Sequence, residues 1–141
     1  MKNAKRALAL VLTMLPLLAA AQLKQDDKLV TKVPFHFIIA NKTVPAGEWT
    51  LRAASDGART VVLRNVDANM ALFSTAAPEI TRKPAASCAL VFNKYGEQYF
   101  LAAVKIAGSN MIYRVSESKA EAEMRAQNVI PAETILLASV K

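Results

Sequence analysis

The sequence predicts an all-β fold, mainly antiparallel: a small sandwich or barrel of about 7–8 short strands with one peripheral C-terminal helix. Three observations support this prediction. Apolar residues recur at every second position in several segments, which buries one face of a strand. Turn residues separate these segments at short intervals. A single stretch, which follows Ser116, has helical patterning.

Composition limits the class of protein. A chain of 141 residues allows one domain, and 53% hydrophobic residues are too many for a disordered chain. The 4 glycines and 6 prolines are ordinary numbers, which excludes a collagen-like or low-complexity protein.

The first 21 residues have the pattern of a secretory signal peptide. Three basic residues precede an apolar run from Ala7 to Leu18, and the small residues Ala19-Ala20-Ala21 follow it. An uncleaved membrane anchor is the alternative, but Pro16 interrupts the run, which is short for a span of about 20 residues. We therefore expect cleavage after Ala21 and export to the periplasm or the extracellular space.

The expected organisation is a signal peptide at 1–21, a flexible polar leader at 22–29 and a single β-rich domain at 30–141. The signal peptide holds three of the 18 basic residues and none of the 11 acidic ones, so its removal lowers the net charge from +7 to +4. The remaining Lys and Arg residues are scattered, which argues against a nucleic-acid partner. No later segment is long and apolar enough to span a membrane.

The first strand is expected from Val33 to Ile39, with Val33, Phe35, Phe37 and Ile39 facing the core and Pro34 near its start. A connection from Ala40 to Gly47 follows, because Pro45 and Gly47 have turn chemistry. The segment from Trp49 to Ala53 then alternates as a second strand.

Turn residues define the next strands. Asp56-Gly57 predicts a hairpin between the second strand and Thr60–Asn65. A reversal at Asp67-Ala68-Asn69 leads into a strand at Met70–Thr75. The less regular segment Pro78–Pro84 is compatible with an edge strand or a loop.

The clearest hairpin pairs Cys88–Asn93 with Gln98–Ile106, and it places Phe92 and Phe100 on the same inward face. Later strands are expected at Met111–Val115 and, after Pro131, at Thr134–Val140. The helix between them begins at Ser116 or Ser118. Ser118 and Glu121 fit a capping box, Glu121 and Arg125 fit an i,i+4 ion pair, and the thin apolar stripe of Ala120 and Met124 indicates a surface position.

Several segments resemble a family of short exported proteins that is abundant in Acidobacteria. They are VPFHF at 33–37, VPAGEW at 44–49, LVFNKYGEQYFL at 90–101 and the charged helix after Ser116. The resemblance covers about Val30 to Gln127, and it implies export and a β-rich domain. The family has no assigned activity, so the resemblance implies no catalytic residue. The family usually has an acidic residue at the position of His36.

The sequence supports no catalytic residue, no metal site and no cofactor. His36 is the only histidine, stands between two phenylalanines and lacks a nucleophile-elbow partner. The single cysteine, Cys88, cannot form an intramolecular disulfide; a buried inert thiol is expected, and an intermolecular disulfide or a reactive thiol is the alternative. Glu48, Glu79 and Glu97 are the carboxylates considered for a hydrolase.

A recognition surface is considered at Tyr95, Glu97 and Tyr99, where aromatic rings flank a glycine-containing turn. The structural alternative is that both tyrosines bracket the hairpin while Trp49 fills the core. The predicted function is that of a non-enzymatic binding or structural module of the cell envelope, whose partner is another envelope protein or a second copy. The alternatives are a small barrel that carries an apolar ligand, and a carboxylate-dependent hydrolase.

Overall fold

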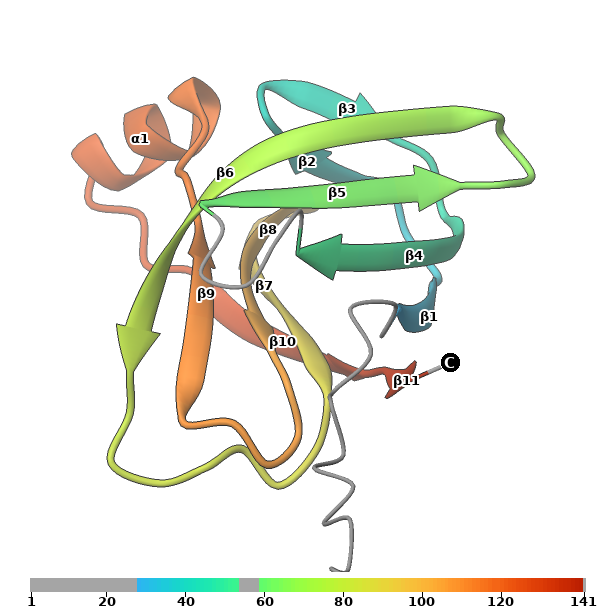
Figure 1. Ribbon diagram of the computed structural model, residues 1–141. Coiled ribbons are helices and arrows are strands. Elements are labelled where there is room, and N and C mark those ends of the chain that lie inside the picture. The colour runs from blue at the N-terminus through green and yellow to red at the C-terminus, as the bar shows by residue number, and fades with distance from the viewer. Residues whose placement is uncertain (1–27, 54–58, 141) are drawn as a thin grey trace, which may run out of the picture.

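The computed structural model describes residues 28–53 and 59–140. Eleven strands and one helix lie in this part of the chain (Figure 1). They are β1 (Leu29–Val33), β2 (Phe37–Ile39), β3 (Lys42–Val44), β4 (Gly47–Ala53), β5 (Thr60–Asn65), β6 (Met70–Ile80), β7 (Ala89–Tyr95), β8 (Gln98–Lys105), β9 (Met111–Val115), α1 (Lys119–Ala126), β10 (Ala132–Leu137) and β11 (Ser139–Val140). The predicted all-β class with one C-terminal helix is confirmed, although the strands are more numerous than expected.

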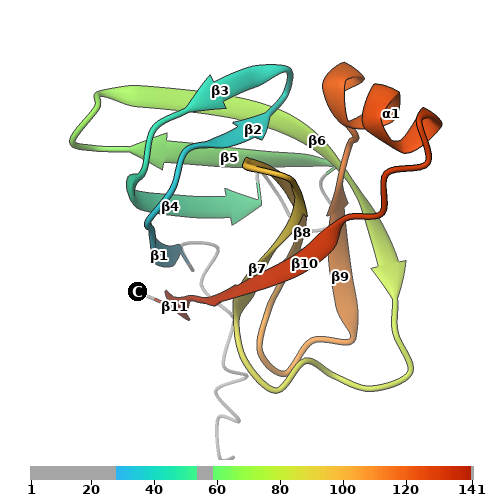
Figure 2. The same ribbon diagram turned by 180° about the vertical axis from the view of Figure 1, so that it is seen from behind.

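The strands form two curved layers that are joined at both sides. On one side, β6 pairs through Met70–Thr75 with β5 and through Ala76–Ile80 with β9. On the other side, β10 pairs with β7, and β11 pairs with β1 (Figure 2). Only Ala138 separates β10 from β11 along the chain. The order β10-β7-β8-β9-β6-β5-β4-β1-β11 therefore closes on itself. The sandwich is also a small closed barrel.

The predicted strand from Val33 to Ile39 is wrong in one respect, because the structure divides it. β1 starts already at Leu29, within the expected leader, and its pairing with β4 ends at Val33. Pro34 has no N–H group to continue this ladder. After the break, β2 joins β8 in the other layer. Residues 1–27, with the expected signal peptide, lie outside the described residues.

The predicted connection from Ala40 to Gly47 contains a short strand instead. β3 pairs with β2, and a two-residue turn of Ala40 and Asn41 joins them. Both turn residues have positive φ angles, 50° and 61°, as a type I′ hairpin turn requires. Ala-Asn is not a typical dipeptide for this turn, so the turn is difficult to predict from these two residues.

The other predicted pairings are confirmed with shifted ends. β4 pairs with β5, although Asp56-Gly57 lies outside the described residues. β6 continues to Ile80 and pairs with β9, so the first part of the 78–84 segment is an internal strand. The final strand region begins at Ala132.

The expectation that Phe92 and Phe100 share the inward face is wrong. Phe92 pairs with Leu101 and belongs to the interior cluster. Phe100 is the neighbour of Leu101, and alternation turns it to the outer face, where it packs edge-on against Tyr95 with ring centroids 5.6 Å apart. Both phenylalanines are buried, Phe92 inside the barrel and Phe100 against side chains on the outer face of β7 and β8.

The interior contains alternate residues of the strands. Aromatic side chains fill one part of it: Phe37 lies 5.4 Å from Trp49 and 5.3 Å from Phe92 between ring centroids. Aliphatic side chains fill the rest. Within the described residues, no helix has both the length and the apolar character that a membrane span needs.

Candidate functional site

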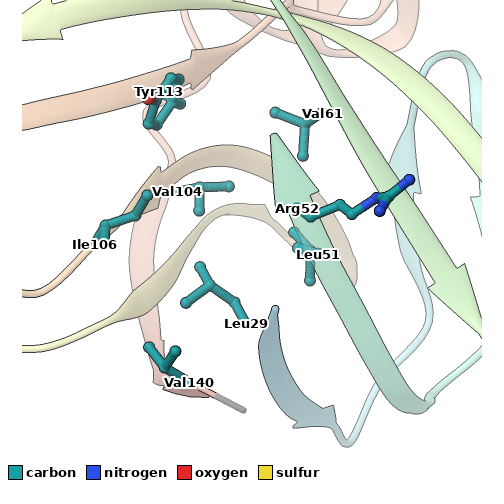
Figure 3. Close-up of a pocket in the computed structure, with 8 residues that line it drawn as sticks. All are labelled: Leu29, Leu51, Arg52, Val61, Val104, Ile106, Tyr113 and Val140. Carbon is teal, nitrogen blue, oxygen red and sulfur yellow. The ribbon is translucent and has the colours of Figure 1, made fainter. Parts of the chain in front are cut away.

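An apolar pocket opens into the barrel between the strands of both layers. We call it the apolar socket. The close-up in Figure 3 shows the side chains that line it, which are Leu29, Leu51, Arg52, Val61, Val104, Ile106, Tyr113 and Val140. All are apolar except Arg52 and the hydroxyl of Tyr113. The guanidinium of Arg52 points away from the aliphatic side chains.

Strand register places these residues together. Leu29 of β1 stands across from Leu51 of β4 and also from Val140 of β11. Val104 of β8 stands across from Tyr113 of β9 in the other layer. The interior is incompletely filled between these residues.

The free space in the socket is about 60 Å³. A site that encloses a whole ligand usually has at least about 300 Å³. The socket is therefore large enough for the end of a chain and too small for a complete ligand of ordinary size. It is open to solvent, since Val140 at its rim keeps 48% of its surface exposed.

The three residues of the predicted recognition surface lie in different environments. Tyr95 is buried, Tyr99 is half-buried and Glu97 is exposed in the β7–β8 turn. The ring of Tyr99 stacks on Phe35 with centroids 3.7 Å apart, and the Lys94 ammonium lies 5.2 Å from its centroid. Only Glu97 and part of Tyr99 are accessible from solvent.

Tyr95 instead contributes to the contact between the barrel and α1. The buried carboxylate of Glu121 accepts hydrogen bonds from Asn93 Nδ2 at 2.7 Å and from the Tyr95 hydroxyl at 3.4 Å. Burial raises the pKa of Tyr95 above its ordinary value, and the nearby negative charge of Glu121 raises it further. This polar contact fixes the helix on the outer face of the barrel.

The predicted pairing of Glu121 with Arg125 is wrong. Arg125 pairs with Glu117 at 2.8 Å, because the Glu121 side chain turns inward. The first half of the capping box is confirmed, since the Glu121 N–H donates to Ser118 Oγ at 3.2 Å. Of the expected apolar stripe, Met124 is half-buried and Ala120 is exposed.

The groups considered for catalysis lie apart. His36 is exposed, and Cys88 is buried with its Sγ accepting a hydrogen bond from the Ala107 N–H at 3.2 Å. Arg114 donates a hydrogen bond to Glu79 at 2.8 Å, and this bond together with the positive charge lowers the pKa of Glu79.

The other two carboxylates are elsewhere in the fold. Glu48 of β4 lies across from Lys32 of β1, and Glu97 lies in the turn after β7. Over residues 28–53 and 59–140, no three side chains of His, Cys, Asp or Glu are grouped as a metal ion requires.

Comparisons with known proteins add no assignment: no family model, no curated protein and no solved structure matches the chain.

Proposed function

We propose that the protein is an exported, non-enzymatic binding module that receives the aliphatic end of a ligand in the apolar socket. The observation that supports this proposal is the lining of the socket: seven of its eight side chains are aliphatic or aromatic, and they converge from six different strands or their ends.

The physical reason is the hydrophobic effect. The socket is accessible to water, yet its walls offer almost no hydrogen-bonding group. An alkyl group that enters it releases this water and gains close contacts with the walls. Each methylene that is buried contributes about 0.8 kcal/mol, or about a fourfold change in Kd.

The small volume defines how the ligand binds. With about 60 Å³ available, only a few terminal carbons enter and the remainder of the ligand stays outside the barrel. This distinguishes the proposal from a carrier that encloses its cargo. An aliphatic side chain of another envelope protein, or of a second copy, would use the same contacts.

A series of straight-chain alcohols from butanol to decanol tests the proposal. Binding is measured by methyl NMR on the mature protein, with labelled Leu and Val side chains. We expect shifts for Leu29, Leu51, Val61 and Val104, all of which line the socket. Affinity should rise by up to about fourfold per added carbon and then level off when the socket is full.

Two matched variants in the last strand region complete the test. Val140→Trp places a large ring at the rim and is expected to weaken alcohol binding at least about tenfold, because the socket has no spare volume for both groups. Leu137→Trp is the control, since Leu137 is 70% exposed and does not line the socket. Equal binding by both variants, or no binding of any alcohol by the wild type, would contradict the proposal.

A further inference from the structure

A second depression lies directly beside the socket, on the outer face of β1, β4 and β5. It has a volume of about 190 Å³, and we call it the cationic groove. Its lining residues are Lys28, Thr50, Leu51, Arg52, Val62 and Arg64. Leu51 and Arg52 line both the groove and the socket, so the two sites adjoin at these residues of β4.

Strand register gathers three cations here that are far apart in the sequence. Leu29 stands across from Leu51, so Lys28 comes next to Arg52 at the end of the same strand pair. Thr50 stands across from Arg64 of β5. Because Thr50 and Arg52 alternate to the same face of β4, all three cationic side chains border one groove.

No carboxylate lines the groove within the part of the chain that the structure describes. Glu48 lies on the same face of β4, four residues before Arg52, but it stands across from another cation, Lys32. Neither of the two ion pairs found among the described residues involves Lys28, Arg52 or Arg64. Three like charges around one depression repel one another, and a bound anion would remove this repulsion.

We propose that the ligand of the socket is an aliphatic oxyanion, a single molecule with an alkyl chain and a terminal carboxylate or phosphate. This inference rests on the proposed function of the socket and adds the chemistry of the other end of the ligand. The alkyl end lies among the aliphatic side chains, and the oxyanion lies in the cationic groove. Arg52 borders both sites, because it lines the socket and the groove and its guanidinium points away from the aliphatic side chains (Figure 3).

The test compares octanol, octanoate and octyl phosphate, which share one alkyl chain. Dissociation constants are measured by calorimetry on the mature protein. At low ionic strength we expect octanoate or octyl phosphate to bind about fivefold more tightly than octanol, as solvent-accessible ion pairs allow. This preference should fall below about twofold in high salt, because the charges near the surface are screened. The tighter of the two anions identifies the headgroup.

Variants locate the effect. Arg64→Gln and Arg52→Gln should each reduce the ratio of the octanol and octanoate dissociation constants to less than about twofold, since each removes one charge from the groove. Lys42→Gln on β3 is the control, an exposed lysine outside the groove, and its ratio should match the wild type.

The possible failures are distinguishable. If octanol itself does not bind, the proposed function of the socket fails. If octanol binds and neither anion binds more tightly, or if Lys42→Gln lowers the ratio as much as Arg64→Gln does, the inference about the oxyanion is overturned. If inorganic phosphate binds as tightly as octyl phosphate, the groove and the socket do not form one site, which also overturns it.

Discussion

Gly47 and Asn65 meet where β4 begins, and their contact requires glycine. Gly47 has a φ angle of +148°, and a Cβ atom there would lie 2.9 Å from Asn65 Nδ2. Asn65 cannot easily move away, because it is buried and its Oδ1 accepts a hydrogen bond from the Ala68 N–H at 3.0 Å. The strand pair β4–β5 therefore depends on the absence of a side chain at this position.

We predict that Gly47→Ala lowers the free energy of unfolding by about 2–3 kcal/mol, because backbone strain and the close contact add together. Urea denaturation measures the loss. Gly96→Ala is the matched control: Gly96 has a φ angle of +61° and no atom within 4 Å of the added Cβ, so strain alone should cost about 1–2 kcal/mol. Equal losses in both variants would show that the contact with Asn65 has no energetic effect.

At the scale of elements, α1 is held by a polar contact and not by an apolar stripe. Glu121 is the buried residue of the helix. Its partners Asn93 and Tyr95 are two positions apart on β7, so both side chains lie on the outer face of that strand. The side chains of Asn93 and Tyr95 would lose this acceptor if the helix moved away. The position of the helix is thus determined by hydrogen bonding.

We predict that Glu121→Ala costs about 1–3 kcal/mol, since it leaves the Asn93 amide without its buried acceptor. Amide exchange in residues 119–126 should accelerate more than in β4 or β5. Glu117→Ala removes an exposed ion pair with Arg125 and should change stability by less than about 0.5 kcal/mol. A similar loss in the two variants would contradict an anchoring role for Glu121.

The sequence predicted elements well where alternation was long and turns were typical. Trp49–Ala53, Thr60–Asn65 and Met111–Val115 are strands as expected. It failed at β3, a three-residue strand in which only Val44 is buried, because such a segment carries too little alternation. It also failed for Glu121, since helical spacing to Arg125 gives no information about the β7 side chains that α1 covers.

The candidate site was less predictable than the strands, for a reason that concerns the whole molecule. The inward position of Leu51 follows from alternation along β4. The meeting of Lys28, Arg52 and Arg64 depends on which strands pair and in which register, and a single sequence contains no direct information on either. For the same reason, scattered basic residues indicated only a solvated surface.

Closure of the barrel depends on a seam between β1 and the last strands. Buried Thr31 on β1 donates a hydrogen bond to the Leu137 carbonyl at 3.1 Å, and the Ala138 N–H donates to the Cys88 carbonyl at 2.9 Å. The first bond joins β1 to the end of β10, and the second extends the pairing of β10 with β7 by one residue. Both bonds therefore stabilise the closed barrel.

We predict that Thr31→Val, which keeps the shape of the side chain, costs about 1 kcal/mol through loss of this bond. Thermal or urea denaturation measures the effect, and amide exchange should accelerate in strands of both layers. Thr43→Val on β3 is an exposed control and should stay within about 0.5 kcal/mol of the wild type. If exchange accelerated only in residues 139–140, the seam would open locally without destabilising the barrel, and the prediction would be contradicted.

The seam also determines when the protein can fold. Thr31 bonds to a carbonyl 106 positions further along the chain, and β7 and β1 both receive a neighbour from residues 132–140. While the ribosome is still making this segment, the nascent polypeptide has two unpaired strand edges and no way to complete its hydrogen bonding. The emerging chain therefore exposes the edges of β1 and β7 until residues 132–140 have been synthesised.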